Sequence, residues 1–145
     1  MTTNPDKINL LVYGTLRVGQ YNEDRFGGFT AIASNVVSDF VVSGRMHNVA
    51  GGRPMYPVVD FTREGRVVGD LLMDIPVENY TFRNIYRMEI GAGYALAEIG
   101  QVNTLFGPKP IHAFHYSVHE ASVGDFIEDG DWIRYDKSFD WSTIK

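Results

Sequence analysis

Short runs of apolar residues, separated by turns that contain glycine, recur along most of this chain. The first run, residues 8–13, is apolar except for Asn9 and stops at Gly14, which is the pattern of a buried strand. Residues 31–48 are rich in Val, Ile and Phe and predict one long bent strand or two strands. Further strands are predicted at 58–61, 66–75, 94–102 and 111–118, and a short segment at 132–135 is expected to return to the sheet.

Two of these strands are expected to form a hairpin. Residues 58–61 and 66–75 are joined by Thr62-Arg63-Glu64-Gly65, which ends with glycine as many turns do. Because strands are many and helices few, we expect an α+β fold. Its sheet is expected to be small, mixed, mostly antiparallel and barrel-like, with a few flanking helices.

One helix is predicted between residues 74 and 91. Asp74 is placed to cap this helix, Pro76 suits its first turn, and Glu78 complements the positive end of the helix dipole. Gly91 is expected to end the helix in the left-handed conformation.

Glu89 extends the apolar face of this predicted helix. Phe82, Ile85, Tyr86 and Glu89 follow one another at i, i+3, i+4 and i+7, so they lie on one side. Partial burial there raises a carboxyl pKa above its ordinary value of about 4.3, toward the pH at which the group both accepts and donates a proton. The alternative is that Glu89 ends the helix and reaches solvent, and the helical pattern by itself favours that alternative.

The loop at residues 13–22 directly follows the first strand. Its glycines allow backbone N–H groups to approach a ligand closely, and successive N–H groups at such a bend can bind an anion. A carboxylate cradle is therefore one interpretation, and an ordinary turn after a strand is the other. A phosphate loop is disfavoured, because the glycines are not followed by Gly-Lys-Ser or Gly-Lys-Thr.

Three histidines lie close together in the sequence, but their spacing does not predict a metal site. On one strand His112 and His115 face opposite sides, and His115 and His119 are roughly 13 Å apart. One zinc ion cannot bridge that distance. Ordinary strand and turn histidines are the favoured interpretation.

Composition excludes several classes of function. The 145 residues are 44% hydrophobic and 21% charged, which is typical of one globular domain spanning 1–145, with 1–7 and 136–145 as loosely ordered tails. The net charge is −5 and no basic cluster occurs, so nucleic acid is not an expected partner. No cysteine is present, which excludes disulfides and thiolate catalysis. No apolar run approaches the ~20 residues of a membrane helix, and we expect a cytoplasmic protein without a signal peptide.

An ordered set of motifs is spread over nearly the whole chain. It consists of Val12-Tyr13-Gly14-Thr15-Leu16-Arg17 with Gly19 and Asn22, Gly44-Arg45-Met46, Tyr56-Pro57, Val67-Val68-Gly69-Asp70-Leu71-Leu72, Glu89 with Tyr94, and Gly130-Asp131-Trp132. This set resembles the γ-glutamylcyclotransferase family in its AIG2-like branch. Relatives usually carry Leu-Asp ahead of the glutamate and Gly directly after it, where this chain has Ile85-Tyr86 and Ile90.

The resemblance implies the fold of that family and cyclisation of a γ-glutamyl amide to 5-oxoproline and a free amine. It implies Glu89 as the catalytic acid and base, no metal and no organic cofactor. The expected partner is the small-molecule γ-glutamyl substrate, the membrane is not a partner, and the protein is expected to be a monomer or a homodimer. The residues it implies for substrate binding are Tyr13, Gly14, Thr15, Leu16 and Tyr94.

Two other functions are left open by the sequence. A non-catalytic module could use the same fold to bind a small carboxylate or a γ-glutamyl compound, and the altered neighbours of Glu89 favour this alternative. A related enzyme could remove a γ-glutamyl protecting group in a biosynthetic pathway, with the same chemistry and a different leaving amine.

Overall fold

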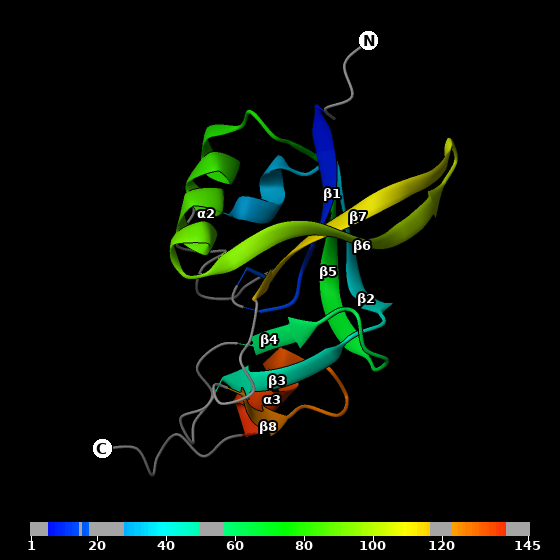
Figure 1. Ribbon diagram of the computed structural model, residues 1–145. Coiled ribbons are helices and arrows are strands. Elements are labelled where there is room, and N and C mark those ends of the chain that lie inside the picture. The colour runs from blue at the N-terminus through cyan, green and yellow to red at the C-terminus, as the bar shows by residue number, and fades with distance from the viewer. Residues whose placement is uncertain (1–5, 15, 18–27, 50–56, 117–122, 139–145) are drawn as a thin grey trace.

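A computed structural model describes residues 6–14, 16–17, 28–49, 57–116 and 123–138 of the chain (Figure 1). They form a five-stranded sheet in the order β2-β5-β1-β7-β6 and a three-stranded sheet in the order β4-β3-β8. In chain order the elements are β1 (Lys7–Val12), the 3-10 helix η1 (Phe29–Ile32), β2 (Asn35–Val42), β3 (Arg45–Val49), β4 (Pro57–Asp60), β5 (Val67–Pro76), α2 (Tyr80–Gly91), β6 (Tyr94–Thr104), β7 (Gly107–Tyr116), β8 (Val123–Phe126) and α3 (Trp132–Ser138).

The central strand of the larger sheet is β1. It runs antiparallel to β5 and parallel to β7, while the other strand pairs of both sheets are antiparallel. The predicted α+β class and the mixed, mostly antiparallel sheet are therefore confirmed. In the part of the chain that the structure describes, the strands form two separate sheets, and the larger one does not close into a barrel.

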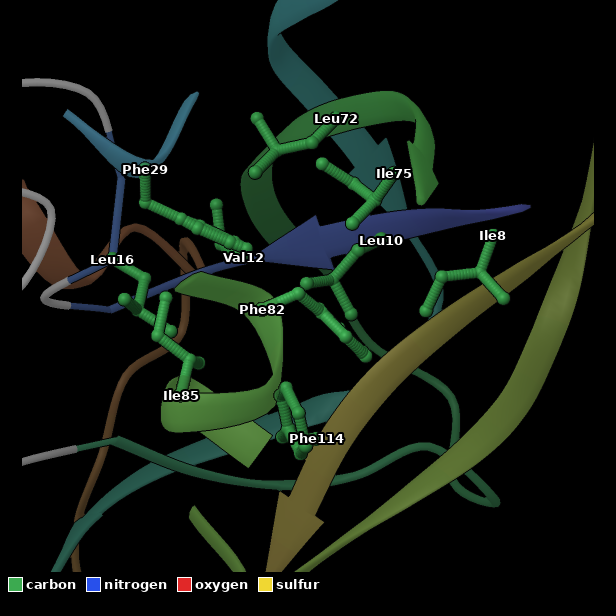
Figure 2. Packing of buried hydrophobic residues seen from close by; sticks show 10 residues of the cluster. All are labelled: Ile8, Leu10, Val12, Leu16, Phe29, Leu72, Ile75, Phe82, Ile85 and Phe114. Carbon is green, nitrogen blue, oxygen red and sulfur yellow. The ribbon is translucent and has the colours of Figure 1, made fainter. Parts of the chain in front are cut away.

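Side chains of β1 are buried on both faces of the sheet, which explains why residues 8–12 are apolar except for Asn9. Ile8, Leu10 and Val12 alternate along the strand and point toward α2 and η1, as Figure 2 shows. Leu11 belongs to a second cluster on the opposite face. The first cluster is completed by apolar residues from the loop after β1 and from η1, β5, α2 and β7, namely Leu16, Phe29, Leu72, Ile75, Phe82, Ile85 and Phe114.

Residues of the smaller sheet and α3 pack against the second face of the larger sheet, and Figure 1 shows these elements gathered toward one end of that sheet. Met46 from β3, Val59 from β4 and Trp132 from α3 pack there with residues of β1, β5 and β7, and each is at most 3% exposed. The end of β1 therefore lies between two packed layers, and this position locates the site described below.

The predicted hairpin of residues 58–61 and 66–75 is wrong. Both strands exist as β4 and β5, but β4 pairs with β3, while β5 pairs with β1 and β2. The segment between them carries the chain from one sheet to the other. A turn that ends in glycine joins two strands, yet it does not determine whether they pair. Residues 31–48 form two strands, β2 and β3, which lie in different sheets.

The predicted start of the helix is also wrong. Asn79 caps α2, because its side-chain Oδ1 accepts hydrogen bonds from the backbone N–H groups of Thr81 (2.8 Å) and Phe82 (3.2 Å). Asp74 and Pro76 instead belong to β5, which remains paired with β1 as far as Pro76. Pairing across the sheet thus overrides the local helix-start pattern.

The helix end differs in its detail from the prediction. Gly91 is the last helical residue, Ala92 follows with φ −87°, and the left-handed residue is Gly93 with φ 98°. Ala92 N–H donates to the carbonyl of Met88 at 3.0 Å, so the last turn continues past Gly91.

Residues 132–135 do not return to the sheet but form most of α3. Asp131 begins this helix, since its Oδ1 accepts a hydrogen bond from Arg134 N–H at 3.2 Å. An apolar run of this length is ambiguous between strand and helix. The helix continues to Ser138 and β1 begins at Lys7, so part of each assigned tail is regular structure. The strand β8 was not predicted from the sequence.

Candidate functional site

A cavity of about 440 Å³ lies at the end of β1. Its walls come from the loop after β1, the last turn of α2, and parts of β4, β6 and β7. The walls are mostly apolar. Besides the predicted site residues, they include Leu11, Val12, Pro57, Met88, Ala92 and Phe114.

The predicted site residues that the structure describes all line this one cavity. They are Tyr13 and Gly14 at the end of β1, Leu16 in the following loop, Glu89 on α2 and Tyr94 at the start of β6. Thr15 lies outside the described residues. The fold therefore brings together a loop and a helix that are more than 70 residues apart in the sequence.

Glu89 places a partly buried carboxyl group on the wall of this cavity. Burial raises its pKa from 4.5 to about 7, because the charged form loses contact with water. Near neutral pH the protonated and ionised forms are therefore comparably populated. The interpretation of Glu89 as a helix-end residue in bulk solvent does not match this placement.

Two tyrosine hydroxyl groups tie the walls of the cavity together. The buried hydroxyl of Tyr13 donates a hydrogen bond to the backbone carbonyl of Phe114, which links β1 to β7. Burial, together with the negative charge of Glu89, raises the pKa of Tyr13, so its hydroxyl stays protonated and neutral. The hydroxyl of Tyr94 donates to the carbonyl of Pro57 at 2.9 Å, which links β6 to β4.

Gly14 occupies a tightly packed position in the loop after β1. Its carbonyl accepts a hydrogen bond from Arg17 N–H at 3.1 Å, which closes a turn. A Cβ atom at Gly14 would lie 3.0 Å from Cγ of Pro57, so the cavity wall leaves little room for a side chain. Leu16, two residues later, is buried in the core beneath α2.

Sequence reasoning missed the lining residues that come from distant strands. Phe114 reaches the cavity because β7 pairs in parallel with β1, across about a hundred residues of chain. No local pattern encodes such a pairing. Met88 and Ala92 could have been predicted from the sequence, since Met88 precedes Glu89 on the predicted helix and Ala92 directly follows the end of that helix.

The three residues that differ from the family pattern near Glu89 are not among the lining residues, and the first of them, Ile85, is buried in the core. Tyr86 is 42% exposed and packs its ring at 6.2 Å from that of Phe114. Ile90 is 43% exposed. None of these departures therefore lines the cavity, although the ring of Tyr86 packs against Phe114, which does.

Within the described ranges, His, Cys, Asp and Glu side chains form no group of three or more that could hold a metal ion. The same ranges contain no helix with the length and apolar character that a membrane span requires.

Replacing Glu89 with glutamine is expected to stabilise the protein at pH 8 and to change little at pH 4. Because the folded pKa is raised, the native state binds more protons than the unfolded chain between pH 4.5 and about 7, and stability falls as pH rises through this window. Glutamine lacks the buried charge, and after allowance for partial exposure we expect a gain of about 2 kcal/mol at pH 8.

Urea denaturation of both proteins at the two pH values measures this difference. The exposed residue Glu64 offers a matched control, and Glu64→Gln should show no comparable dependence on pH. A stability difference for Glu89→Gln that is the same at pH 4 and pH 8 would contradict the prediction.

The fold and the site define a small α+β domain that holds one carboxyl group in an apolar cavity beside a glycine-containing loop. Residues 10–134 match the family described as gamma-glutamyl cyclotransferase, AIG2-like, and the chain belongs to this family. The predicted resemblance to this family is thereby confirmed.

Two solved structures are similar to this chain. The crystal structure of YkqA from Bacillus subtilis has a TM-score of 0.61 and is 22% identical, over 92% of this chain and 44% of YkqA. The solution structure of At5g39720.1 from Arabidopsis thaliana has a TM-score of 0.59 and is 16% identical, over 93% of this chain and 86% of the plant protein. This chain thus spans less than half the length of YkqA, and both likenesses show the fold alone. No curated protein matches this chain.

Proposed function

We propose that this protein is a cyclotransferase that converts a γ-glutamyl amide to 5-oxoproline and a free amine. The observation that carries the proposal is the carboxyl group of Glu89, with a pKa of about 7, on the same cavity as Gly14 and Leu16. Family membership supports the same reaction class.

In the proposed reaction the α-amine of the substrate attacks its own γ-carbonyl carbon. A new carbon–nitrogen bond closes the five-membered ring, and the bond to the leaving nitrogen breaks. Nucleophile and electrophile share one molecule, so the protein has mainly to hold a reactive conformer. Glu89 accepts a proton from the attacking nitrogen and returns it to the leaving nitrogen. One carboxyl group serves both steps best when its pKa is near neutral.

The substrate is proposed to bind with its α-carboxylate at the backbone N–H groups of the loop from Gly14 to Leu16. Tyr13 and Tyr94 form sides of the pocket, and their hydroxyl groups already donate hydrogen bonds to backbone carbonyls. Proton transfer and amide exchange within one substrate require no cofactor. A chain without cysteine fits our proposal that the enzyme is cytoplasmic. We also propose that it is a monomer or a homodimer.

The test is the release of 5-oxoproline from a panel of γ-glutamyl amino acids and γ-glutamyl amines. We expect release from at least one member, and the best substrate identifies the leaving amine. Binding of these compounds without any release would favour the non-catalytic module and overturn the proposal.

Replacing Gly14 with valine is expected to raise KM at least tenfold, with a smaller effect on kcat. A Cβ atom there already lies 3.0 Å from the Pro57 ring, so a branched side chain displaces the loop that is proposed to bind the α-carboxylate. Steady-state kinetics on the best substrate measures both constants.

Gly100→Val is the matched control, because a Cβ atom at Gly100 has no neighbour within 4 Å and this residue is not among the cavity lining. A folded Gly14→Val protein with the KM of the parent would show that the loop backbone does not bind the substrate.

A further inference from the structure

The loop that lines the cavity ends in an ion cluster in which Arg17 and Asp70 are buried, Asp131 is partly exposed and Asp39 is largely exposed. The guanidinium group of Arg17 belongs to a side chain that is only 5% exposed. Its Nη2 lies 2.9 Å from Oδ1 of Asp39 and 3.2 Å from Oδ1 of Asp70, and its Nη1 lies 3.4 Å from Oδ1 of Asp131. One arginine therefore joins β2, β5 and the start of α3 to the loop.

Three of the sequence motifs meet in this cluster. Arg17 ends the Tyr-Gly-Thr-Leu-Arg segment, Asp70 belongs to Val-Val-Gly-Asp, and Asp131 to Gly-Asp-Trp. The proposed reaction uses none of these three charged side chains. Their convergence on one point indicates a shared task that the reaction chemistry does not explain.

Backbone strain is also stored at this point. Asp39 has φ 55°, which is unfavourable for a residue other than glycine, and it lies at an irregularity in the pairing of β2 with β5. The bulge brings its carboxylate to Arg17 and lets its N–H donate to Oδ1 of Asp70 at 3.3 Å.

The turn from Gly14 to Arg17 is thus held on two sides. Leu16 is buried in the core beneath α2, and Arg17 is bound by the aspartates. Gly14 and Leu16 line the cavity, whereas Arg17 is not among its lining residues. Because Arg17 N–H donates to the Gly14 carbonyl at 3.1 Å, we expect a displaced Arg17 to shift the backbone of the adjoining cavity wall.

A buried ion pair such as Arg17–Asp70 is weak evidence for stability alone, because the desolvation of its charges offsets their attraction. The planar, forked guanidinium group of arginine binds several carboxylates in fixed directions, which the ammonium group of lysine cannot do. The cluster is therefore suited to fixing the position of the loop that carries Arg17.

We propose that Arg17 is a positioning residue that holds the backbone of Gly14 and Leu16 in the conformation that binds the α-carboxylate of the substrate. The inference rests on the proposed function for the identity of that ligand. It predicts that Arg17→Lys, which keeps the charge and loses the fork, raises KM about tenfold to a hundredfold while kcat changes less.

The experiment compares wild type, Arg17→Lys and the double variant Arg17→Met/Asp70→Asn, which removes a buried charge together with its partner. Arg134→Met is the matched control, since Arg134 pairs with Asp129 at 3.7 Å on the exposed side of the same segment. Both Arg17 proteins should show the raised KM, and Arg134→Met should keep the KM of wild type. A lowered melting temperature with unchanged KM in folded Arg17 proteins would overturn the inference.

A second readout separates this inference from the proposed function. Labelled wild type and Arg17→Lys are titrated with 5-oxoproline while the amide signal of Gly14 is followed by NMR. If wild type releases no 5-oxoproline but binds it, and Arg17→Lys binds it at least tenfold more weakly, the positioning role stands and the proposed function fails. Equal dissociation constants would overturn the positioning role, as would a wild-type Gly14 amide that does not respond.

Discussion

Replacing Glu89 with glutamine is expected to lower kcat on a γ-glutamyl amide by about two to four orders of magnitude, with the fold retained. Glutamine has nearly the same shape but neither accepts nor donates a proton in the pH range of the reaction. The carboxyl group it replaces lines the cavity and has a pKa of about 7, so the expected loss is that of a general acid and base.

The pH profile sharpens this prediction. In wild type, kcat/KM should fall as pH drops below about 7, because the protonated form of Glu89 cannot accept a proton from the attacking nitrogen. The Glu89→Gln protein should lack this fall. The exposed residue Glu98 on β6 provides the control variant Glu98→Gln, which should keep both the rate and the profile. A Glu89→Gln protein with wild-type turnover would remove Glu89 from the mechanism.

A double consequence follows for Glu89→Gln, since the same variant is expected to be more stable at pH 8. A carboxyl group held in an apolar wall costs folding free energy whenever it is ionised. Gain of stability with loss of turnover is the pattern of a residue that is retained for function.

Gly130→Ala is expected to destabilise the protein by about 4 kcal/mol or more. Gly130 has φ 67°, and a Cβ atom there would lie 1.6 Å from the carbonyl oxygen of Arg66. Its own carbonyl accepts a hydrogen bond from Val68 N–H at 2.9 Å, so the two backbones are in direct contact. An alanine must separate them and so disturbs the segment that leads into α3.

Thermal and urea unfolding measure this effect. Alanine variants of two other glycines separate the contribution of backbone strain from that of the steric clash. Gly107 has φ 96° but no neighbour within 4 Å of a Cβ atom, so Gly107→Ala reports backbone strain alone. Gly91, the last residue of α2, has neither problem, and Gly91→Ala should be neutral or stabilising by up to about 1 kcal/mol. The prediction fails if Gly130→Ala unfolds no more readily than Gly107→Ala.

The glycine and the aspartate of the Gly-Asp-Trp motif are therefore each required by a different contact. Gly130 permits the close approach of two backbones, and Asp131 both caps α3 and binds Arg17. Sequence alone marked the motif by resemblance, and its physical basis lies in contacts with β5 and with the loop after β1.

Part of the fold was predictable because it depends on the local spacing of apolar side chains along the chain. The apolar run that forms β1, the alternation of strands with turns, and the position of Phe82 and Ile85 on the buried face of α2 all follow from side-chain spacing. The errors occurred where a distant partner decides the outcome. Asp74 stays in a strand because β5 pairs with β1, and β4 leaves β5 because β3 offers it a partner.

By itself, the sequence determined the strand-rich class, the glycine loop after the first strand, and Glu89 as an acidic residue on an apolar helical face. Tertiary structure alone decided that this loop and this helix share a cavity, that Phe114 and Pro57 complete its walls, and that the buried Arg17 side chain pairs with three aspartates. The physical reason is the range of the forces involved. Helix and strand spacing depend on near neighbours in the chain, whereas desolvation, ion pairing and sheet register depend on residues that only folding brings into contact.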